Sequence, residues 1–276
     1  MHRRWFIRVL RHTAVVAVVL WSAGPILVLV LASLKLSRDI FVWPPALLSP
    51  PTLANYIRLW QRFPDFFSAI VSSTVVTIGA TLLTVTAATS AGYVYSRYRS
   101  RSLTLSAFFM IFVRMLPPIV ISLPLFPVVN AIGLNDTWTV LILLYASFFV
   151  SLSTWIMKTT IDQIPPELDE AARVDGANVQ QILCRIILPL GAQGIIAAAV
   201  FVIVYAWNEF LFAFLLTTTH AKTAPLAIGE MISSVETGDW GVLFAASTLQ
   251  LLPVLLFVVL VQKYLIAGFT AGAVKG

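Results

Sequence analysis

Charged residues are scarce in this sequence. Only 11% of its 276 residues are charged, while 59% are hydrophobic. A soluble globular domain carries roughly 25% charged residues. A core of this length cannot hide so much apolar surface from water, but a bilayer replaces water as the solvent along an apolar helix. The sequence therefore predicts an integral membrane protein.

Other absences narrow the possible functions. The single cysteine, Cys184, excludes an intrachain disulfide. The three histidines are scattered and form no ligand set for a metal. There is no GxxxxGK[ST] phosphate-binding sequence, and no paired acids or Ser–His arrangement favours an intramembrane enzyme. The net charge of +6 is small for a nucleic-acid binder. We expect no metal, no nucleic acid, no catalytic residue and no ATP hydrolysis by this chain.

Six apolar runs dominate the chain. They cover residues 13–34, 70–94, 103–126, 137–157, 192–216 and 244–266. Each run is long enough to cross ~30 Å of hydrocarbon as a helix, and none shows the alternation of a barrel strand. The first run follows a basic start and exceeds the ~7–15 residues of a signal-peptide core. We interpret it as an uncleaved helix, with a twin-arginine signal at Arg3-Arg4 as the alternative. The prediction is an all-α membrane protein with six transmembrane helices.

The distribution of Lys and Arg predicts the orientation. With the N-terminus inside, twelve of the 18 basic residues lie in inside segments and five in outside segments. This excess favours cytoplasmic N- and C-termini. The outside segment 35–66 is rich in proline and aromatic residues, and the inside segment 158–190 carries five acids. A long acidic cytoplasmic segment suits a docking surface.

Residues 165–189 have the pattern of a helix–turn–helix. Pro166 suits the first helical position, and the acids after it suit the positive end of the helix dipole. Gly176 can end the helix in a left-handed conformation. Asn178 can cap a second helix, which Pro189 is expected to stop. Small residues at the elbow would let a partner approach closely.

This segment resembles the EAA loop of ABC-importer permeases, and residues 170–177 are similar to the form in maltose-type sugar permeases. In that family the loop is a coupling helix that sits in a cleft of an ATPase subunit. The resemblance implies that Glu170 pairs with a basic group of the ATPase and that Gly176 is the elbow. The implied coupling residues are Glu170, Ala171, Ala172, Asp175, Gly176, Ala177, Leu188 and Pro189. From the local pattern alone, an ordinary amphipathic connector is the alternative.

Further segments carry the same resemblance from the second span onward. Residues 114–118, 133–137 and 207–210 resemble family motifs of the third span, of the outside turn before the fourth and of the fifth span. Residues 268–276 closely resemble the carboxyl end of one of the two maltose-type permease subunits, whose tail reaches the ATPase interface. The implied tail contacts are Gly272, Val274 and Lys275. The first span and the loop after it match less specifically.

Two charges fall inside predicted spans. Arg114 lies in the third span and Glu209 in the fifth, at depths that differ by ~9 Å along a helix. Because a charge at mid-bilayer costs a few kcal/mol, it usually faces a cavity or a partner. We expect Arg114, Trp207, Asn208 and Glu209 to line a translocation path, where a ring can stack on a sugar. The alternative is a structural ion pair or a snorkelling side chain.

The resemblance implies a permease subunit of an ATP-driven importer in the bacterial inner membrane, working by alternating access. It implies a heterodimer with a second permease, two copies of an ATPase that holds ATP and Mg, an extracytoplasmic binding protein and surrounding lipid, with no cofactor in this chain. The expected substrate is a sugar or sugar derivative. A polyamine or other organic solute, or a stand-alone secondary transporter, is the alternative. We expect an anchor helix and outside loop over 1–66. The permease core would cover 67–276, with the coupling loop at 158–190 and the tail at 267–276.

Overall fold

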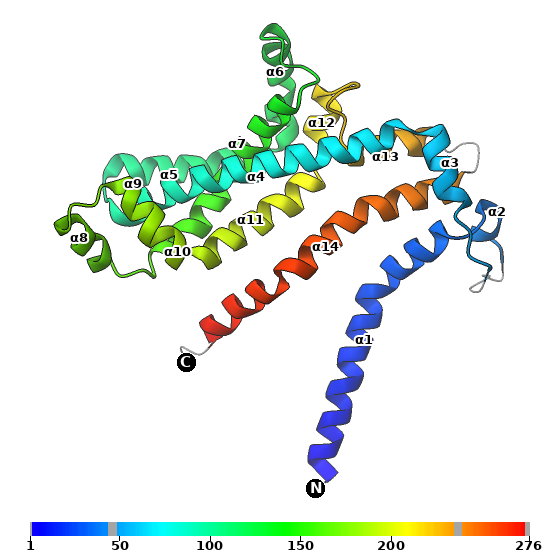
Figure 1. Cartoon of the computed structure of the whole chain (residues 1–276), viewed down its shortest axis with the longest axis horizontal. Helices are drawn as coiled ribbons and strands as arrows, with labels where there is room; N and C mark the ends of the chain where they lie inside the picture. Colours follow the sequence, from blue (N-terminus) through cyan, green and yellow to red (C-terminus); the bar gives the residue numbers. More distant parts are fainter. Residues whose placement is uncertain (1, 44–48, 235–238, 274–276) are drawn as a thin grey trace. The chain divides into compact units, whose positions relative to one another are not determined.

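Helices make up all regular structure in the described part of the chain (Figure 1). The computed structural model describes residues 2–43, 49–234 and 239–273. These residues form two compact units. Unit one comprises residues 1–66 and 227–253, and unit two comprises residues 67–226 and 254–276. The predicted all-α membrane fold is confirmed, while the expected division into an anchor over 1–66 and a core over 67–276 stays a prediction.

Four of the six predicted spans are single long helices. They are α1 (His2–Ser33), α4 (Asp65–Arg97), α7 (Trp138–Ile161) and α14 (Trp240–Ala273). Four helices are long and apolar enough to cross a membrane, and the number rises to six if each of two bent helix pairs counts as one span. None of the apolar window of α1 is buried within the protein. The side chains of this window are therefore available to lipid.

The third predicted span, residues 103–126, is broken at Pro117 and Pro118, where prolines are expected to interrupt the hydrogen bonds of a helix. It consists of α5 (Arg101–Arg114) and α6 (Pro118–Ala131), which meet at 94°. Pro117 has an extended backbone, with ψ at 134°, because a residue before proline is disfavoured in the helical region. Pro118 then opens α6, where its missing N–H leaves no helical bond unmade.

The fifth predicted span is also interrupted. The helix α11 (Ala192–Trp207) ends at Asn208, and the short α12 (Leu211–Leu216) follows. At its other end, α11 makes an angle of 82° with the helical segment Val179–Leu190 that precedes it. Gly191 lies at this bend, and a Cβ there would lie 2.7 Å from the carbonyl oxygen of Ile187. Only glycine fits so tight a corner without displacing backbone.

The core of unit two forms where α4, α7 and α11 pack together. One buried cluster includes Leu141, Tyr145 and Val202, and a second includes Met157 and Ile187. Small residues bring the helices close: a Cβ on Gly92 of α4 would lie 2.8 Å from the Cβ of Met157. Without a hydrophobic drive between helices in lipid, close packing of this kind supplies much of the association.

Unit one contains the short helices α2 (Ser37–Ile40) and α3 (Ala54–Arg62), and α13 (Ala224–Ser234) ends in it. The buried Asn55 side chain donates to the carbonyl oxygens of Ser33, at 2.8 Å, and Lys35, at 2.6 Å. The first bond satisfies a carbonyl at the end of α1 that has no helical partner, and the second holds the residues just after the helix. Asp239 forms ion pairs with Arg58 and Arg62. Polar contacts therefore hold the segment after α1 in place.

Candidate functional site

The helix–turn–helix predicted at 165–189 is present in unit two. Its first helix is α8 (Glu167–Val174), with Pro166 at the N-cap, one position earlier than expected. Gly176 has φ +84°, which confirms the left-handed elbow. Asn178 and Gln181 form a reciprocal capping box at the start of α9 (Val179–Ile182). The local signals of this segment therefore determine its local geometry.

The expectation that Pro189 stops the second helix is wrong. A π-helical turn, η1 (Leu183–Ile187), follows α9 and leads into α10 (Leu188–Leu190). Pro189 falls at the start of α10. The chain continues to the bend at Gly191 instead.

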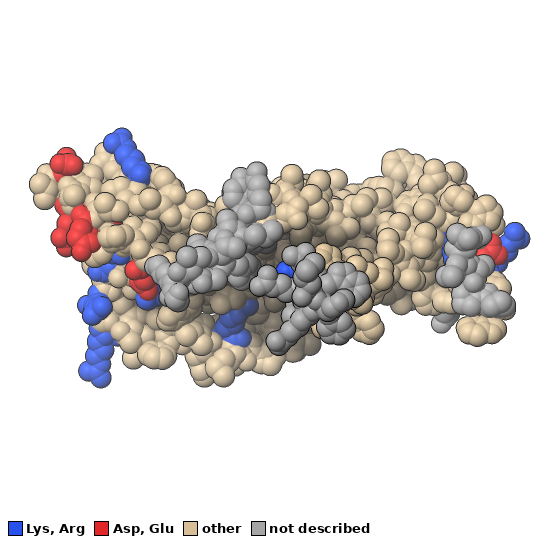
Figure 2. Space-filling view, turned by 90° about the horizontal axis from the view of Figure 1, so that it is seen from below, with Lys and Arg blue, Asp and Glu red and all other residues tan. Residues whose placement is uncertain are grey.

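The elbow presents an exposed acidic surface. Glu170, Ala171, Asp175 and Gly176 are exposed, as are Leu188 and Pro189 at the end of the second helix. Ala172 and Ala177 are half-buried against the cluster that contains Met157. Figure 2 shows acidic side chains gathered at the end of unit two that holds α8. Val174 is 88% exposed beside them. An acidic rim around an apolar residue suits a protein partner with basic groups.

A buried ion pair fixes this surface to the end of α4. Asp169, only 3% exposed, accepts a hydrogen bond from Arg97 Nε at 2.9 Å. The same guanidinium donates to the carbonyl oxygens of Ile164, at 2.9 Å, and Ile161, at 3.3 Å. One arginine therefore holds both α8 and the turn that precedes it.

This pair does not follow from the sequence, where Asp169 is one of several acids in the first turn of a helix. One signal was available: Asp169 and Ala172 are three residues apart and share a helix face. Arg173 adds a second tie to the same region, donating to the hydroxyls of Tyr98, at 3.2 Å, and Tyr93, at 3.4 Å. The coupling segment is thus attached to α4 at two points.

Arg114 lies at the end of α5, beside the break in the third span. Its guanidinium carbon is 5.2 Å from the ring centre of Phe148 and 5.4 Å from that of Phe201. Nη1 donates to the carbonyl oxygen of Phe148 at 3.1 Å. Arg114 also lines a cavity of about 400 Å³, together with Ser147, Ser151 and mostly apolar side chains. A charged donor among aromatic rings in a cavity is able to bind hydroxyl groups and ring faces.

Glu209 lies at the break in the fifth span. It accepts hydrogen bonds from the hydroxyl of Tyr145 at 2.7 Å and from the backbone N–H groups of Phe212 and Ala213 at 2.9 and 3.4 Å. These bonds satisfy donors at the start of α12, as an N-cap residue does. Within the described residues Glu209 forms no ion pair with Arg114. Arg114 and Glu209 therefore do not form the structural ion pair that was the alternative interpretation.

The other two residues expected on the path differ in exposure. Asn208 is exposed, and its Nδ2 donates to the carbonyl oxygen of Val204 at 2.8 Å, at the end of α11. Trp207 is buried, with 4% exposure. Aromatic rings connect the two breaks: Phe212 lies 6.3 Å from Tyr145 and 5.9 Å from Phe148, centre to centre. Arg114 and Glu209 thus border one aromatic cluster without touching each other.

The carboxyl tail is described only in part. Gly272 lies in the last turn of α14, whereas Val274 and Lys275 lie outside the described residues. Their expected contacts with an ATPase stay predictions.

Asp136, which lies in the 133–137 motif, joins two segments that are distant in the sequence. Its backbone is left-handed, with φ +58°. Its carboxylate accepts hydrogen bonds from the backbone N–H groups of four consecutive residues, 218–221, at 2.9 to 3.1 Å. Partial burial raises the pKa of this carboxyl, but the N–H donors outweigh that effect and lower the pKa to about 2. The turn before α7 is thereby fastened to the segment after α12.

Comparison with known proteins places the chain among transport proteins. Residues 80–270 match the family described as binding-protein-dependent transport system inner membrane component. The chain is 34% identical over 238 residues to the trehalose/maltose transport system permease protein MalG of Thermococcus litoralis, with 86% of each chain covered. It is 35% identical over 230 residues to the trehalose transport system permease protein SugB of Mycobacterium tuberculosis, covering 83% of this chain and 84% of the other.

Two further matches extend the comparison. The chain is 30% identical over 254 residues to the sulfoquinovosyl glycerol transport system permease protein SmoH of Agrobacterium fabrum, covering 91% of this chain and 88% of the other. A chain in the crystal structure of a bacterial ABC transporter involved in the import of the acidic polysaccharide alginate has a similar fold. Its TM-score is 0.77 at 19% identity, over 96% of this chain and 98% of that chain.

Proposed function

Because the chain belongs to the family of binding-protein-dependent transport system inner membrane components, we propose that it carries a sugar or sugar derivative across the inner membrane. An extracytoplasmic binding protein delivers the substrate, and a separate ATPase supplies the energy, so the chain is a transport subunit and not an enzyme. Trehalose, maltose and sulfoquinovosyl glycerol appear in the names of its relatives, which supports a glycoside substrate.

The assembly we propose has four kinds of subunit. They are this chain, a second permease with which it forms a heterodimer, an ATPase present in two copies that bind ATP and Mg, and the binding protein. Both termini of this chain are cytoplasmic. Glu170, Asp175 and the small residues of the elbow dock into the ATPase cleft, with Leu188 and Pro189 at the edge. The carboxyl tail, with Gly272, Val274 and Lys275, reaches the same partner. The exposed acidic elbow supports this docking, because Glu170 and Asp175 form no ion pair with any residue in 2–43, 49–234 or 239–273.

The observation that carries the mechanism is the attachment of the elbow to a span. If the ATPase displaces α8, Asp169 moves with it, and the ion pair with Arg97 transmits this displacement to the cytoplasmic end of α4. Since α4 packs against α7 and α11 in a dense core, its displacement would spread through unit two. ATP binding in the partner would then switch the bundle between inward-facing and outward-facing states.

The translocation path we propose runs past the two broken spans. Arg114 and the rings beside it would offer donors and stacking faces to a sugar, and Asn208 and Glu209 would provide polar groups at the other break. Trp207, which is buried, would support that break and would not contact the substrate directly. Non-helical backbone at membrane depth is tolerated where it lines such a cavity.

Reconstitution tests the proposal. The assembled transporter, in liposomes with its binding protein, is expected to show sugar-stimulated ATP hydrolysis and uptake. Glu170→Arg should abolish retention of the ATPase, whereas Glu167→Arg, which reverses an exposed acid of the same turn, should retain it. Uptake by this chain with no ATPase present, or uptake of a polyamine in preference to any sugar, would overturn the proposal.

A further inference from the structure

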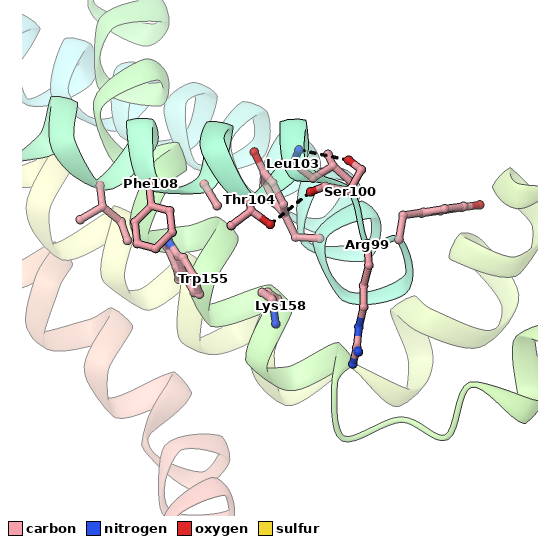
Figure 3. A pocket seen from close by; sticks show the side chains of 11 residues that line it. Arg99, Ser100, Leu103, Thr104, Phe108, Trp155 and Lys158 are labelled. Carbon is pink, nitrogen blue, oxygen red and sulfur yellow. Dashed lines mark hydrogen bonds between the residues drawn. The ribbon is translucent and has the colours of Figure 1, made fainter.

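A second cavity of unit two has a different character from the one beside Arg114. Its volume is about 420 Å³, and it lies where the turn after α4 meets α5 and α7 (Figure 3). Its polar lining is Arg99, Ser100, Thr104 and Lys158, together with Tyr95 and Tyr98. Figure 3 shows Arg99 at one end of the lining, Phe108 and Trp155 at the other, and Lys158 between them. One basic group thus lies at one end, apolar rings lie at the other, and a second basic group lies between them.

We propose that this cavity binds an anionic phospholipid of the cytoplasmic leaflet. The inference rests on the orientation proposed above, in which the turn 96–102 is cytoplasmic. Basic pockets at the cytoplasmic ends of transmembrane helices bind anionic headgroups, because the charges lie at headgroup depth. This lipid would be a bound component of the transporter, distinct from the sugar that it moves.

The charges at the mouth suit a phosphate. Arg99 is exposed and forms no ion pair within the described ranges. Lys158 Nζ is 2.6 Å from Asp162 Oδ2, so this acid shares the charge of the lysine. Arg99 therefore presents the larger uncompensated charge, and Lys158 adds a second donor. Ser100 is committed to capping α5, since its hydroxyl accepts from Leu103 N at 3.2 Å.

The apolar lining suits an acyl chain. Leu103, Ala107 and Ile111 are spaced four residues apart, so they follow one face of α5 for ~12 Å. One leaflet contributes roughly 15 Å of the hydrocarbon core. Phe108 extends the surface and is 67% exposed. A free phosphate or a soluble anion would contact only the basic residues. A phospholipid would place its headgroup at the basic residues and its acyl chain along the apolar residues, as its orientation in a membrane requires.

Lys158 connects this cavity to the coupling loop. It is in the last turn of α7, and its bond to Asp162 bridges to the residues that lead to α8. An anionic headgroup near Lys158 would compete with Asp162 for the ammonium group. Occupancy of the cavity is therefore expected to change how strongly substrate stimulates the ATPase, without changing assembly.

Native mass spectrometry of the assembled transporter tests the site. After extraction from membranes that contain phosphatidylcholine and phosphatidylglycerol, we expect one retained phosphatidylglycerol per copy of this chain. At about 1 kcal/mol for each basic residue, Arg99→Gln should lower its retention about fivefold, and the double change with Lys158→Gln up to about thirtyfold. Arg101→Gln, which removes an exposed charge outside the cavity lining, should leave retention unchanged.

A second pair of variants tests the apolar half. Ala107→Phe would fill the slot and should reduce retention, whereas Leu105→Phe enlarges an exposed residue of the same helix outside the lining and should not. Intact complexes in the spectrum show that each variant has folded and assembled. Excess inorganic phosphate should not displace the lipid.

Four results would overturn the inference: no retained phosphatidylglycerol, equal retention of phosphatidylcholine, displacement by phosphate, or a crosslink from Thr104→Cys in the cavity to the second permease. Because retention is counted without any transport assay, a failed lipid site leaves the proposed import function standing. Conversely, lipid retention in a complex that moves no sugar would refute the import function alone.

Discussion

Breaking the Arg97–Asp169 pair should disconnect the coupling segment from α4. The two side chains are only 9% and 4% exposed. Removing one member of a buried pair leaves an uncompensated charge and typically costs about 3–5 kcal/mol. Arg97→Met also leaves the carbonyls of Ile161 and Ile164 without their donor. We expect a loss in this range for docking of α8 on α4, which corresponds to a shift of more than a hundredfold in that local equilibrium.

The assay compares sugar-stimulated ATP hydrolysis with the basal rate in the assembled transporter, together with limited proteolysis of the 158–190 segment. Arg97→Met and Asp169→Leu should each abolish stimulation and expose the segment to protease. The double variant should be less impaired than either single one, because a buried pair replaced by apolar groups is often neutral. This result would separate the pair from two unrelated packing defects.

The exposed pair in the same segment provides a control. Lys158 and Asp162 have side-chain exposures of 28% and 40%, and exposed pairs spaced i, i+4 contribute only about 0.3–0.5 kcal/mol. Asp162→Asn should therefore leave proteolysis unchanged. If Arg97→Met also left proteolysis and stimulation unchanged, or if the double variant simply added the two single losses, the pair would not be the connection between the ATPase and the span.

Three further predictions concern the elbow, the outside turn and the fifth-span break. Gly176→Val should lower coupled ATP hydrolysis, because a valine strains this left-handed backbone by about 1–2 kcal/mol and adds a side chain where the ATPase is proposed to dock, although no described atom of this chain lies within 4 Å of a Cβ there. Because the pKa of Asp136 is lowered, its contribution to the stability of the fold is complete above pH ~4 and is lost as the pH drops toward about 2. Asp136→Asn should remove this pH dependence from thermal melts and, after discounting for solvent screening, cost about 1 kcal/mol at neutral pH. An unchanged pH profile in the variant would contradict the structural role of the carboxylate. Glu209→Gln keeps a hydrogen-bond acceptor for the start of α12, whereas Glu209→Ala removes it at a cost of about 1 kcal/mol. The Gln variant should therefore lower the melting temperature of the complex less than the Ala variant. Equal melting temperatures for the two variants would refute the capping role.

Composition and local pattern determined the class of this protein and several of its details. Continuous apolar runs predict membrane helices because lipid leaves the backbone no other way to satisfy its hydrogen bonds. The left-handed Gly176 and the capping box at Asn178 followed from neighbouring residues alone, since their geometry involves only a few consecutive dihedral angles. The order of these local signals also carries the family resemblance.

Features that join distant residues were decided by the tertiary structure. Asp169 is buried because Arg97, 72 positions away in the chain, arrives with its guanidinium beside it. Glu209 meets Tyr145, 64 positions away, and not Arg114. The break in the third span puts Arg114 beside a cavity, whereas hydropathy alone predicts a continuous span there. Local propensity fixes dihedral angles and apolar faces, but the partner of a buried charge depends on which helices pack together.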